Sequence, residues 1–373
     1  MVGKRNLEDN FKKVADRDYR VPSGCAVMGV MSQKRKKFTG RAVMKAIGVM
    51  RERTNGLGGG YAAYGIYPRY ADHYAFHLLY DDEKAKEATE EHLEKNFTID
   101  KYEAIPTREV EAIKSRPLLW RYFLEPKGMD GSSKDDFVLK AAMHVNRNIK
   151  GAYVISSGKN MGIFKGVGYP EDIGRFFKLE SYRGYLWTAH GRFPTNSVSW
   201  WGGAHPFGLL DWSVVHNGEI SSYGINRRFL LNFGYHCTLS TDTEVIAYLF
   251  DFLVRKQGLA IEVAAGVLAA QFWDEIGRLP EEQRKLYLAL RMAYGGALLN
   301  GPFSVIVGCE SGMIGLNDRI KLRPLVAARG DKMLYISSEE AGIREICPSP
   351  DQVWMPEAGV PVIRRFESGG ENG

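Results

Sequence analysis

The chain has 373 residues, of which 45% are hydrophobic and 25% are charged, a composition that supports a sizeable packed core and excludes a mainly disordered protein. The net charge of +6 comes without a long basic block, so we expect no nucleic-acid partner. No uninterrupted apolar run reaches the length of about 18 residues that a membrane span requires, and none is expected.

The four cysteines are widely spaced and form no CxxC pair. This usage is typical of the reducing cytoplasm and argues against a disulfide framework or a thiolate zinc site. The first 24 residues alternate acidic and basic side chains and lack the apolar segment of a signal peptide. We therefore expect a cytoplasmic protein.

The N-terminal part begins with a polar leader over residues 1–24, a helix followed by an extended stretch. The apolar stretch CAVMGVMS, which starts at Cys25, predicts a short strand buried on both faces. A helix near 39–53 and a glycine-rich bend lead to a second strand. Residues 74–110 then predict a strand, a helix and a strand, which indicates a small αβ lobe over residues 74–126 that is inserted between core strands.

The rest of the chain predicts a helix from residue 137, strands to about 220, helices over 241–256 and 260–294, and strands again over 302–366. Residues 367–373 are expected to form a loose tail. The sequence shows no internal repeat and no low-complexity linker. One large mixed α/β domain over residues 25–366 is therefore the expected organisation.

Two motifs are better explained by structure than by ligand binding. The GLGGG run lacks the strand-to-helix context of a dinucleotide site, so it predicts a turn or a close backbone approach. His190, His205 and His216 have no helical i, i+4 pairing and no companion carboxylates, so we expect structural histidines and no metal.

Three other positions each admit two interpretations. Arg192 follows an apolar strand and could bind a carboxylate with both guanidinium nitrogens, or form an ordinary salt bridge. Asn217-Gly218 is by default a hairpin turn; the alternative is an oxyanion site built from the Asn amide and the Gly N–H. Asp242 is most simply a helix N-cap, although a carboxylate there could also bind a substrate ammonium group.

Cys25 is either the start of a buried strand or a nucleophile. No histidine or aspartate near it in the sequence suggests a conventional Cys–His pair. A free α-amino group, with an ordinary pKa of about 8, could act as the base if the chain is cut between Gly24 and Cys25. The residues alone leave both interpretations open.

Several stretches follow one another in a characteristic order: Cys25 with AVMGVMS, RERTNGLGGGYAAYG, AHGRFPTN, AHPF, HNGEI, STDTEVIAYLF, GPFSVIVG, GLNDRIKLRPLV and YISSEEAGI. In this order they resemble the motifs of class II glutamine amidotransferases, which are N-terminal-nucleophile hydrolases with a four-layer αββα fold. The resemblance covers roughly residues 20–366. In its leader and its 74–126 lobe, the chain is similar to the stand-alone glutaminase subunit of archaeal-type glutamate synthase.

The resemblance implies an α+β sandwich in which Cys25 is the nucleophile and its own freed amine the base. It also implies that Asn217 and Gly218 form the oxyanion hole. Thiolate attack on the glutamine side-chain amide would release ammonia, and water would then hydrolyse the resulting thioester to glutamate. The leader would be a propeptide that withholds the amine while attached.

For the substrate, the resemblance implies that Arg192 holds the glutamine α-carboxylate, helped by Thr195, and that Asp242 takes the α-ammonium. Arg53 would lie near the cysteine. The sequence departs from the family around Arg53, where Glu-Arg-Thr replaces His-Arg-Gly, and at Phe193, where Phe-Pro replaces the Trp-Ala of some relatives.

As to partners, the resemblance implies a hetero-oligomer in which ammonia passes to the FMN-binding subunit of glutamate synthase. The chain shows no flavin, iron–sulfur or nicotinamide motif, so no cofactor is expected here, and flavin and iron–sulfur centres are expected on partner subunits. Two alternatives remain: the same half-reaction serving another synthase, and a non-catalytic glutamine-binding subunit with an uncut leader.

Overall fold

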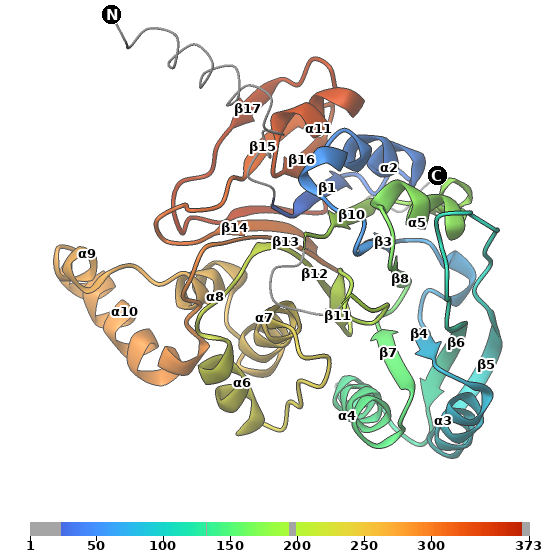
Figure 1. The fold of residues 1–373 in the computed structure, drawn as a ribbon. Coiled ribbons are helices and arrows are strands. Elements are labelled where there is room, and N and C mark those ends of the chain that lie inside the picture. The colour runs from blue at the N-terminus through green and yellow to red at the C-terminus, as the bar shows by residue number, and fades with distance from the viewer. Residues whose placement is uncertain (1–23, 132, 194–198, 368–373) are drawn as a thin grey trace, which may run out of the picture.

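The computed structural model describes residues 24–131, 133–193 and 199–367. Two antiparallel sheets pack face to face at the centre of the molecule (Figure 1). In spatial order the larger sheet contains β17 (Gln352–Trp354), β15 (Val326–Gly330), β16 (Met333–Ser337), β1 (Ala26–Ser32), β10 (Leu186–Gly191), β3 (Gly59–Tyr64) and β8 (Met161–Gly166). The smaller contains β11 (Phe207–Leu209), β12 (Trp212–Gly218), β13 (Phe303–Cys309), β14 (Gly312–Asn317) and β18 (Val362–Arg365).

Helices cover the outer face of each sheet. On the larger sheet these are α2 (Arg41–Gly48), α5 (Pro170–Phe176) and α11 (Glu340–Ile346). Around the smaller sheet lie α6 (Tyr223–Leu231), α7 (Asp242–Phe250), its π-helical continuation η4 (Asp251–Lys256) and α8 (Ile261–Leu268), with α9 (Trp273–Gly277) and α10 (Glu281–Tyr294) beyond them (Figure 1). The four-layer αββα sandwich is therefore confirmed.

The inserted lobe contains its own four-stranded sheet, in the order β5 (Phe97–Ala104), β6 (Leu118–Pro126), β4 (Tyr74–Tyr80) and β7 (Ala152–Ser156). Two helices, α3 (Glu83–Asn96) and α4 (Ser133–Asn148), pack on it. Because β7 pairs directly with β4, this sheet runs past the expected boundary at residue 126. A small ribbon of β2 (Phe38–Thr39) and β9 (Arg183–Gly184) completes the strands described.

Strand β1 lies at the centre of the larger sheet, and all seven of its residues are buried. It pairs with β10 on one edge and β16 on the other, while α2 covers one face and the smaller sheet the other. Two covered faces explain why the sequence of this strand does not alternate. At Gly29 a Cβ atom would lie 2.7 Å from Met313 Sδ and 2.8 Å from Ile306 Cγ2, so glycine permits the close approach of the two sheets.

The prediction of a loose tail over residues 367–373 is wrong at Glu367. The Glu367 N–H donates to the Gln33 carbonyl (2.8 Å), and the Glu367 carboxylate pairs with Lys332 (3.2 Å). Residues 368–373, like residues 1–23 of the leader, lie outside the described part of the chain. In that part no helix is both long and apolar enough to cross a membrane.

Candidate active site

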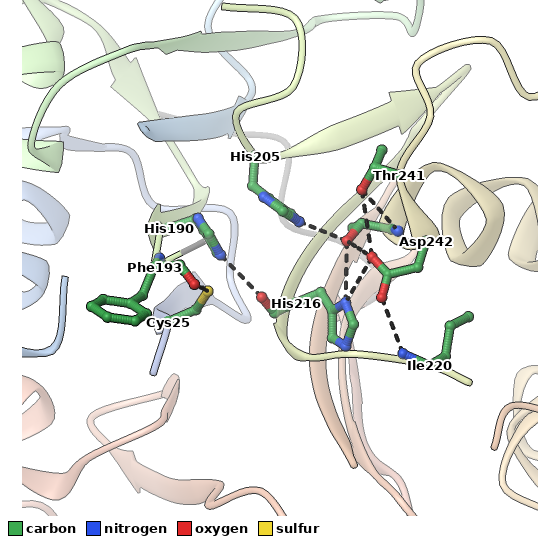
Figure 2. Close-up of polar contacts among 9 residues, drawn as sticks. Cys25, His190, Phe193, His205, His216, Ile220, Thr241 and Asp242 are labelled. Carbon is green, nitrogen blue, oxygen red and sulfur yellow. Dashed lines mark hydrogen bonds and ion pairs between the residues drawn. The ribbon is translucent and has the colours of Figure 1, made fainter. Parts of the chain in front are cut away.

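Cys25 immediately precedes β1, and its thiol contacts the chain just after the neighbouring strand β10. The Phe193 N–H donates to Cys25 Sγ (3.4 Å), and the Phe193 carbonyl lies 4.0 Å from the same sulfur (Figure 2). Among the described residues, no histidine or carboxylate is hydrogen-bonded to this sulfur. The described part of the chain thus holds no conventional Cys–His or Cys–carboxylate hydrogen bond at this thiol.

The electrostatic surroundings of Cys25 bring together residues that are far apart in sequence. Burial raises the pKa of the Cys25 thiol, and the negative charge of Asp242 adds to this effect. The Phe193 backbone hydrogen bond and the positive charges of Arg192 and Arg323 act in the opposite direction. The net result is a raised pKa, so a thiol at neutral pH is protonated until a base removes the proton.

Gly24 shows what surrounds the peptide bond that precedes Cys25. A Cβ atom at Gly24 would lie 3.4 Å from Arg53 Nη2, 3.5 Å from Asn217 Oδ1 and 3.6 Å from Arg323 Nη1. The Gly24–Cys25 bond is thus adjacent to two guanidinium groups and to the amide expected in the oxyanion hole. Arg53 also forms an ion pair with Glu339 at the start of α11 (Nη1–Oε1 2.6 Å).

Arg323 is the residue at this site that the sequence reasoning missed. It lies within GLNDRIKLRPLV, a stretch noted only for its likeness to closing strands of the family. In the structure it follows a turn in which Asp318 accepts hydrogen bonds from the Ile320 and Leu322 N–H groups. A single arginine between a turn and a proline has no periodicity, so no local signal marks it.

Asn217 and Gly218 end β12, and the hairpin interpretation of this pair is wrong. They pair with Ser304 and Phe303 of β13, which is far away in sequence. Gly218 has φ +141°, and a Cβ there would lie 2.0 Å from the Pro302 carbonyl oxygen, so only glycine fits. The Asn217 side chain is 1% exposed, and neither its amide nitrogen nor its oxygen has a hydrogen-bond partner among the described residues.

Asp242 is the first residue of α7, and its interpretation as the N-cap is also wrong. Thr241 is the N-cap, and its hydroxyl accepts from the Thr243 N–H (3.4 Å). The Asp242 carboxylate instead accepts from the Ile220 N–H (3.1 Å) and the Thr243 hydroxyl (3.2 Å), and lies 3.6 Å from His216 Nδ1 (Figure 2). Burial alone would raise its pKa, but His216 and these hydrogen bonds outweigh burial and hold the pKa below its ordinary value.

Arg192 follows β10 and is 5% exposed. Its N–H donates to the Gly58 carbonyl (2.8 Å), and its side chain packs so closely on Gly58 that a Cβ there would lie 3.0 Å from Arg192 Cδ. This contact gives the glycine-rich run its role as a close backbone approach. Burial lowers the pKa of the guanidinium, and the negative charges of Cys25 thiolate and Asp242 oppose that shift.

The three histidines form a buried layer, in which each ring keeps one nitrogen without a hydrogen-bond partner among the described residues. His190 and His205 stack with ring centroids 4.0 Å apart, and His190 Nε2 donates to the His216 carbonyl (3.0 Å). His205 and His216 both contact the Thr243 hydroxyl, at 2.6 and 3.1 Å. The layer therefore links β10 and β12 to the first turn of α7, which carries Asp242.

A buried lysine and glutamate lie beyond this layer, and neither was singled out from the sequence. The Lys165 ammonium donates to the Gly202 (2.9 Å) and Pro206 (3.2 Å) carbonyls, and burial lowers its pKa to about 7. Glu244 accepts from the Thr238 and Leu239 N–H groups, and burial raises its pKa to about 7. Both support the loops around the site.

The remaining expectations are quickly placed. Thr195 lies outside the described residues, so its role stays a prediction. Within the described ranges, no group of three or more His, Cys, Asp and Glu side chains is arranged to hold a metal ion. All four cysteines are free thiols. The structure thus brings Cys25, Arg53, Arg192, Asn217 and Asp242 to one region; their chemical roles remain predictions.

Comparison with known proteins places part of the chain in a family. Residues 67–232 match the family "Glutamine amidotransferases class-II", a range that includes Arg192, Asn217 and Gly218 but not Cys25 or Asp242. A Rhizobium meliloti glutamine amidotransferase-like protein, GlxB, is 30% identical over 55% of this chain, which spans 59% of that protein.

Similarity extends further along the chain in another relative. An uncharacterized protein of Archaeoglobus fulgidus is 50% identical over 359 residues, covering 95% of this chain and 94% of its own length. Among solved structures, the glutamine PRPP amidotransferase of B. subtilis aligns with a TM-score of 0.45 at 14% identity, over 92% of this chain and 50% of that one. Residues 67–232 thus match the class II glutamine amidotransferase family, and over nearly its whole length the chain belongs to one family with the Archaeoglobus fulgidus protein.

Proposed function

We propose that this protein hydrolyses L-glutamine to glutamate and ammonia through a thioester on Cys25. The observation that carries the proposal is the set of charges around one half-buried thiol: Arg192 and Asp242 both act electrostatically on Cys25, from two different layers of the fold. A guanidinium and a carboxylate that both act on one thiol complement the α-carboxylate and α-ammonium of an amino acid. A ligand that lacks either end would leave a buried charge unpaired, which accounts for selectivity.

The first chemical step requires a base. In our proposal the chain is cut between Gly24 and Cys25, and the new α-amine of Cys25 accepts the thiol proton. The thiolate then attacks the side-chain amide carbon of glutamine, forming a C–S bond while the carbonyl oxygen becomes an oxyanion. Support comes from the raised pKa of the thiol and from the absence of a basic side chain bonded to it in the described residues.

Asn217 and Gly218 supply the donors for that oxyanion. A buried amide without a partner costs free energy, of the order of 1–3 kcal/mol, unless a ligand satisfies it. The assignment of the Asn217 nitrogen and oxygen can be exchanged by an amide flip without losing any hydrogen bond, since neither atom is engaged. Collapse of the tetrahedral intermediate expels ammonia, which carries away the proton held by the α-amine, and water then cleaves the thioester to glutamate.

The direct test is replacement of Cys25 by alanine. We expect ammonia release from glutamine to fall by about 10³-fold or more, because the nucleophile is lost. Cys347→Ala is the matched control, since Cys347 is also a half-buried free thiol. Unchanged activity in Cys25→Ala would remove this residue from the site, and glutamine binding without ammonia release in the unaltered protein would favour a non-catalytic binding subunit.

For the destination of the ammonia, we propose a partner synthase, with the FMN-binding subunit of glutamate synthase as the candidate and no cofactor on this chain. The basis is the resemblance of the leader and the inserted lobe to that subunit type. Purification of the native complex tests it: a flavin-containing subunit that converts 2-oxoglutarate to glutamate is expected to accompany the chain. A different synthase in its place would favour the alternative acceptor.

A further inference from the structure

A cavity lies away from Cys25, between the inserted lobe and the helical layer of the smaller sheet. It is a cavity of about 740 Å³ bounded by α4, by α6 and by the segment of residues 235–240 that joins α6 to α7. Figure 1 shows this segment between α6 and α4. The volume falls in the range of about 300–1,000 Å³ that is usual for small-molecule sites.

The charged side chains that line this cavity are basic. Arg147, Arg227, Arg228 and His236 line it, and no described residue of its wall is an aspartate or glutamate. A smaller hollow of about 190 Å³ shares Arg147 and His236 and adds Lys140 and His144, again without a carboxylate in its described lining. We call the two hollows together the basic cavity. Acidic residues are almost as numerous as basic ones in the whole chain, 44 against 50, so such a wall is not a result of overall composition.

The arginines of the basic cavity are not used for internal ion pairs. Within the described residues, Arg227 and Arg228 form no salt bridge, and Arg147 contacts only the ring of His236 (Nη1–Nε2 3.2 Å). The Arg228 guanidinium folds back over Gly224, with Nη1 at 3.5 Å from where a Cβ of that glycine would be. Uncompensated guanidinium groups around a hollow attract an anion, and their planar donor sets match phosphate oxygens in pairs.

The walls of the basic cavity are held in place by carboxylates that lie behind it. Asp136 of α4 and Asp251 of η4 both bind Arg255 (each 2.6 Å), which ties the lobe to the helical layer. The Tyr235 hydroxyl donates to Asp251, and Glu244 holds the Thr238 and Leu239 N–H groups. These acids are engaged with their own partners, so the geometry of the cavity is preformed while its surface stays positive.

We propose that the basic cavity is a binding site for a phosphorylated small molecule. Arg147, Arg227 and Arg228 bind the phosphate group, and the half-buried Tyr223 ring offers a surface for the organic part of the ligand. A single inorganic phosphate would fill only a small part of about 740 Å³, which is why we infer an organic phosphate. The segment of residues 235–240 continues directly into Thr241 and Asp242. This segment would therefore separate the ligand from the candidate active site.

Calorimetric titration tests this proposal in Cys25→Ala protein, so that the result does not depend on glutamine hydrolysis. Glucose 6-phosphate and inorganic pyrophosphate are the probes, and succinate is the carboxylate comparator. We expect glucose 6-phosphate to bind with a Kd of about 1 mM or tighter at low salt. In the double variant Arg227→Ala/Arg228→Ala its affinity falls by about tenfold or more.

The matched control is Arg284→Ala, because Arg284 is an exposed helical arginine on α10 with no ion pair among the described residues. The Arg284→Ala variant is expected to bind glucose 6-phosphate with the same affinity as the parent protein. Arg227, Arg228 and Arg284 are all exposed, so we expect their replacement to leave the fold intact. Thermal unfolding of each variant checks this. No binding of either phosphate at 20-fold above the expected Kd, an equal loss in Arg284→Ala, or succinate binding as tightly as glucose 6-phosphate would each overturn the proposal.

Discussion

The candidate active site and the basic cavity use positive charge in opposite ways. At Cys25, Arg192 is only 5% exposed and acts on the thiol together with Asp242, while Arg53 and Arg323 are half-buried. In the basic cavity the arginines are exposed and all of one sign. Buried charges act strongly over short distances and demand a complementary ligand, whereas exposed charges are weakened by water and salt. The predictions below test that difference.

The largest effect after loss of the nucleophile is expected at Asn217. Asn217→Ala removes an oxyanion donor, so kcat should fall by about 10²–10³-fold while KM changes little. Ser304→Ala is the matched control, because Ser304 pairs with Asn217 across the strands and is also fully buried. Steady-state ammonia release measures both; a fall of similar size in Ser304→Ala would mean that packing, rather than the amide, is responsible.

Asp242→Asn tests the buried-charge argument on the substrate side. The variant retains an oxygen for the Ile220 N–H but loses the negative charge, so kcat/KM for glutamine should fall on the order of 100-fold, the effect of leaving a charge unpaired. Thr241→Ala separates this from helix stability, because it removes the N-cap and should cost about 1 kcal/mol of unfolding free energy. Normal kcat/KM in Asp242→Asn would contradict the ammonium-binding role.

The histidine layer gives a prediction for stability against pH. Burial lowers the pKa of His190 from 6.5 to about 3, so between these values the unfolded chain binds a proton that the native chain does not. Its contribution to stability is therefore complete above pH 6.5 and is lost as pH falls toward 3, at up to about 1.4 kcal/mol per pH unit. Urea unfolding at pH 7 and pH 5 should show a shallower pH dependence in His190→Gln; an unchanged slope would refute the assignment.

The smallest expected effect is that of salt. Between about 50 and 500 mM KCl the Debye length shrinks from above 10 Å to a few ångströms, so glucose 6-phosphate binding at the exposed arginines should weaken several-fold. The KM for glutamine should change by less than about twofold, because Arg192 and Asp242 act at short range inside the protein. A salt-sensitive KM for glutamine together with salt-insensitive glucose 6-phosphate binding would contradict the assignment of buried charges to the first site and exposed charges to the second.

Most of the candidate active site could be predicted because its residues lie in compact motifs at the ends of buried strands. Cys25 stands where an apolar run begins, Arg192 and Asn217 stand where one stops, and the structure brings these strand ends together. The local interpretations failed where the chain returns from far away: β13 pairs with Asn217-Gly218 across more than 80 residues, which no dipeptide rule can reveal.

What could not be predicted depends on loops and on surfaces. Arg323 reaches the site after a turn organised by Asp318, and Lys165 and Glu244 became notable only once the layers around them were known. The extent of the lobe was underestimated because β7 joins its sheet only after α4. In the sequence, Arg227 and Arg228 are typical of a polar helix face. The cavity exists because α4, which is distant in sequence, forms its other side.

The central claim is that Cys25 acts with its own α-amine, which requires cleavage of the Gly24–Cys25 bond. The most direct measurement combines an active-site titration with the intact mass of the same sample. It compares the fraction of protein that hydrolyses glutamine with the fraction of chains that begin at Cys25. We predict that the active fraction begins at Cys25 and lacks residues 1–24. Full activity in a chain that still spans Met1–Gly373 would contradict the account.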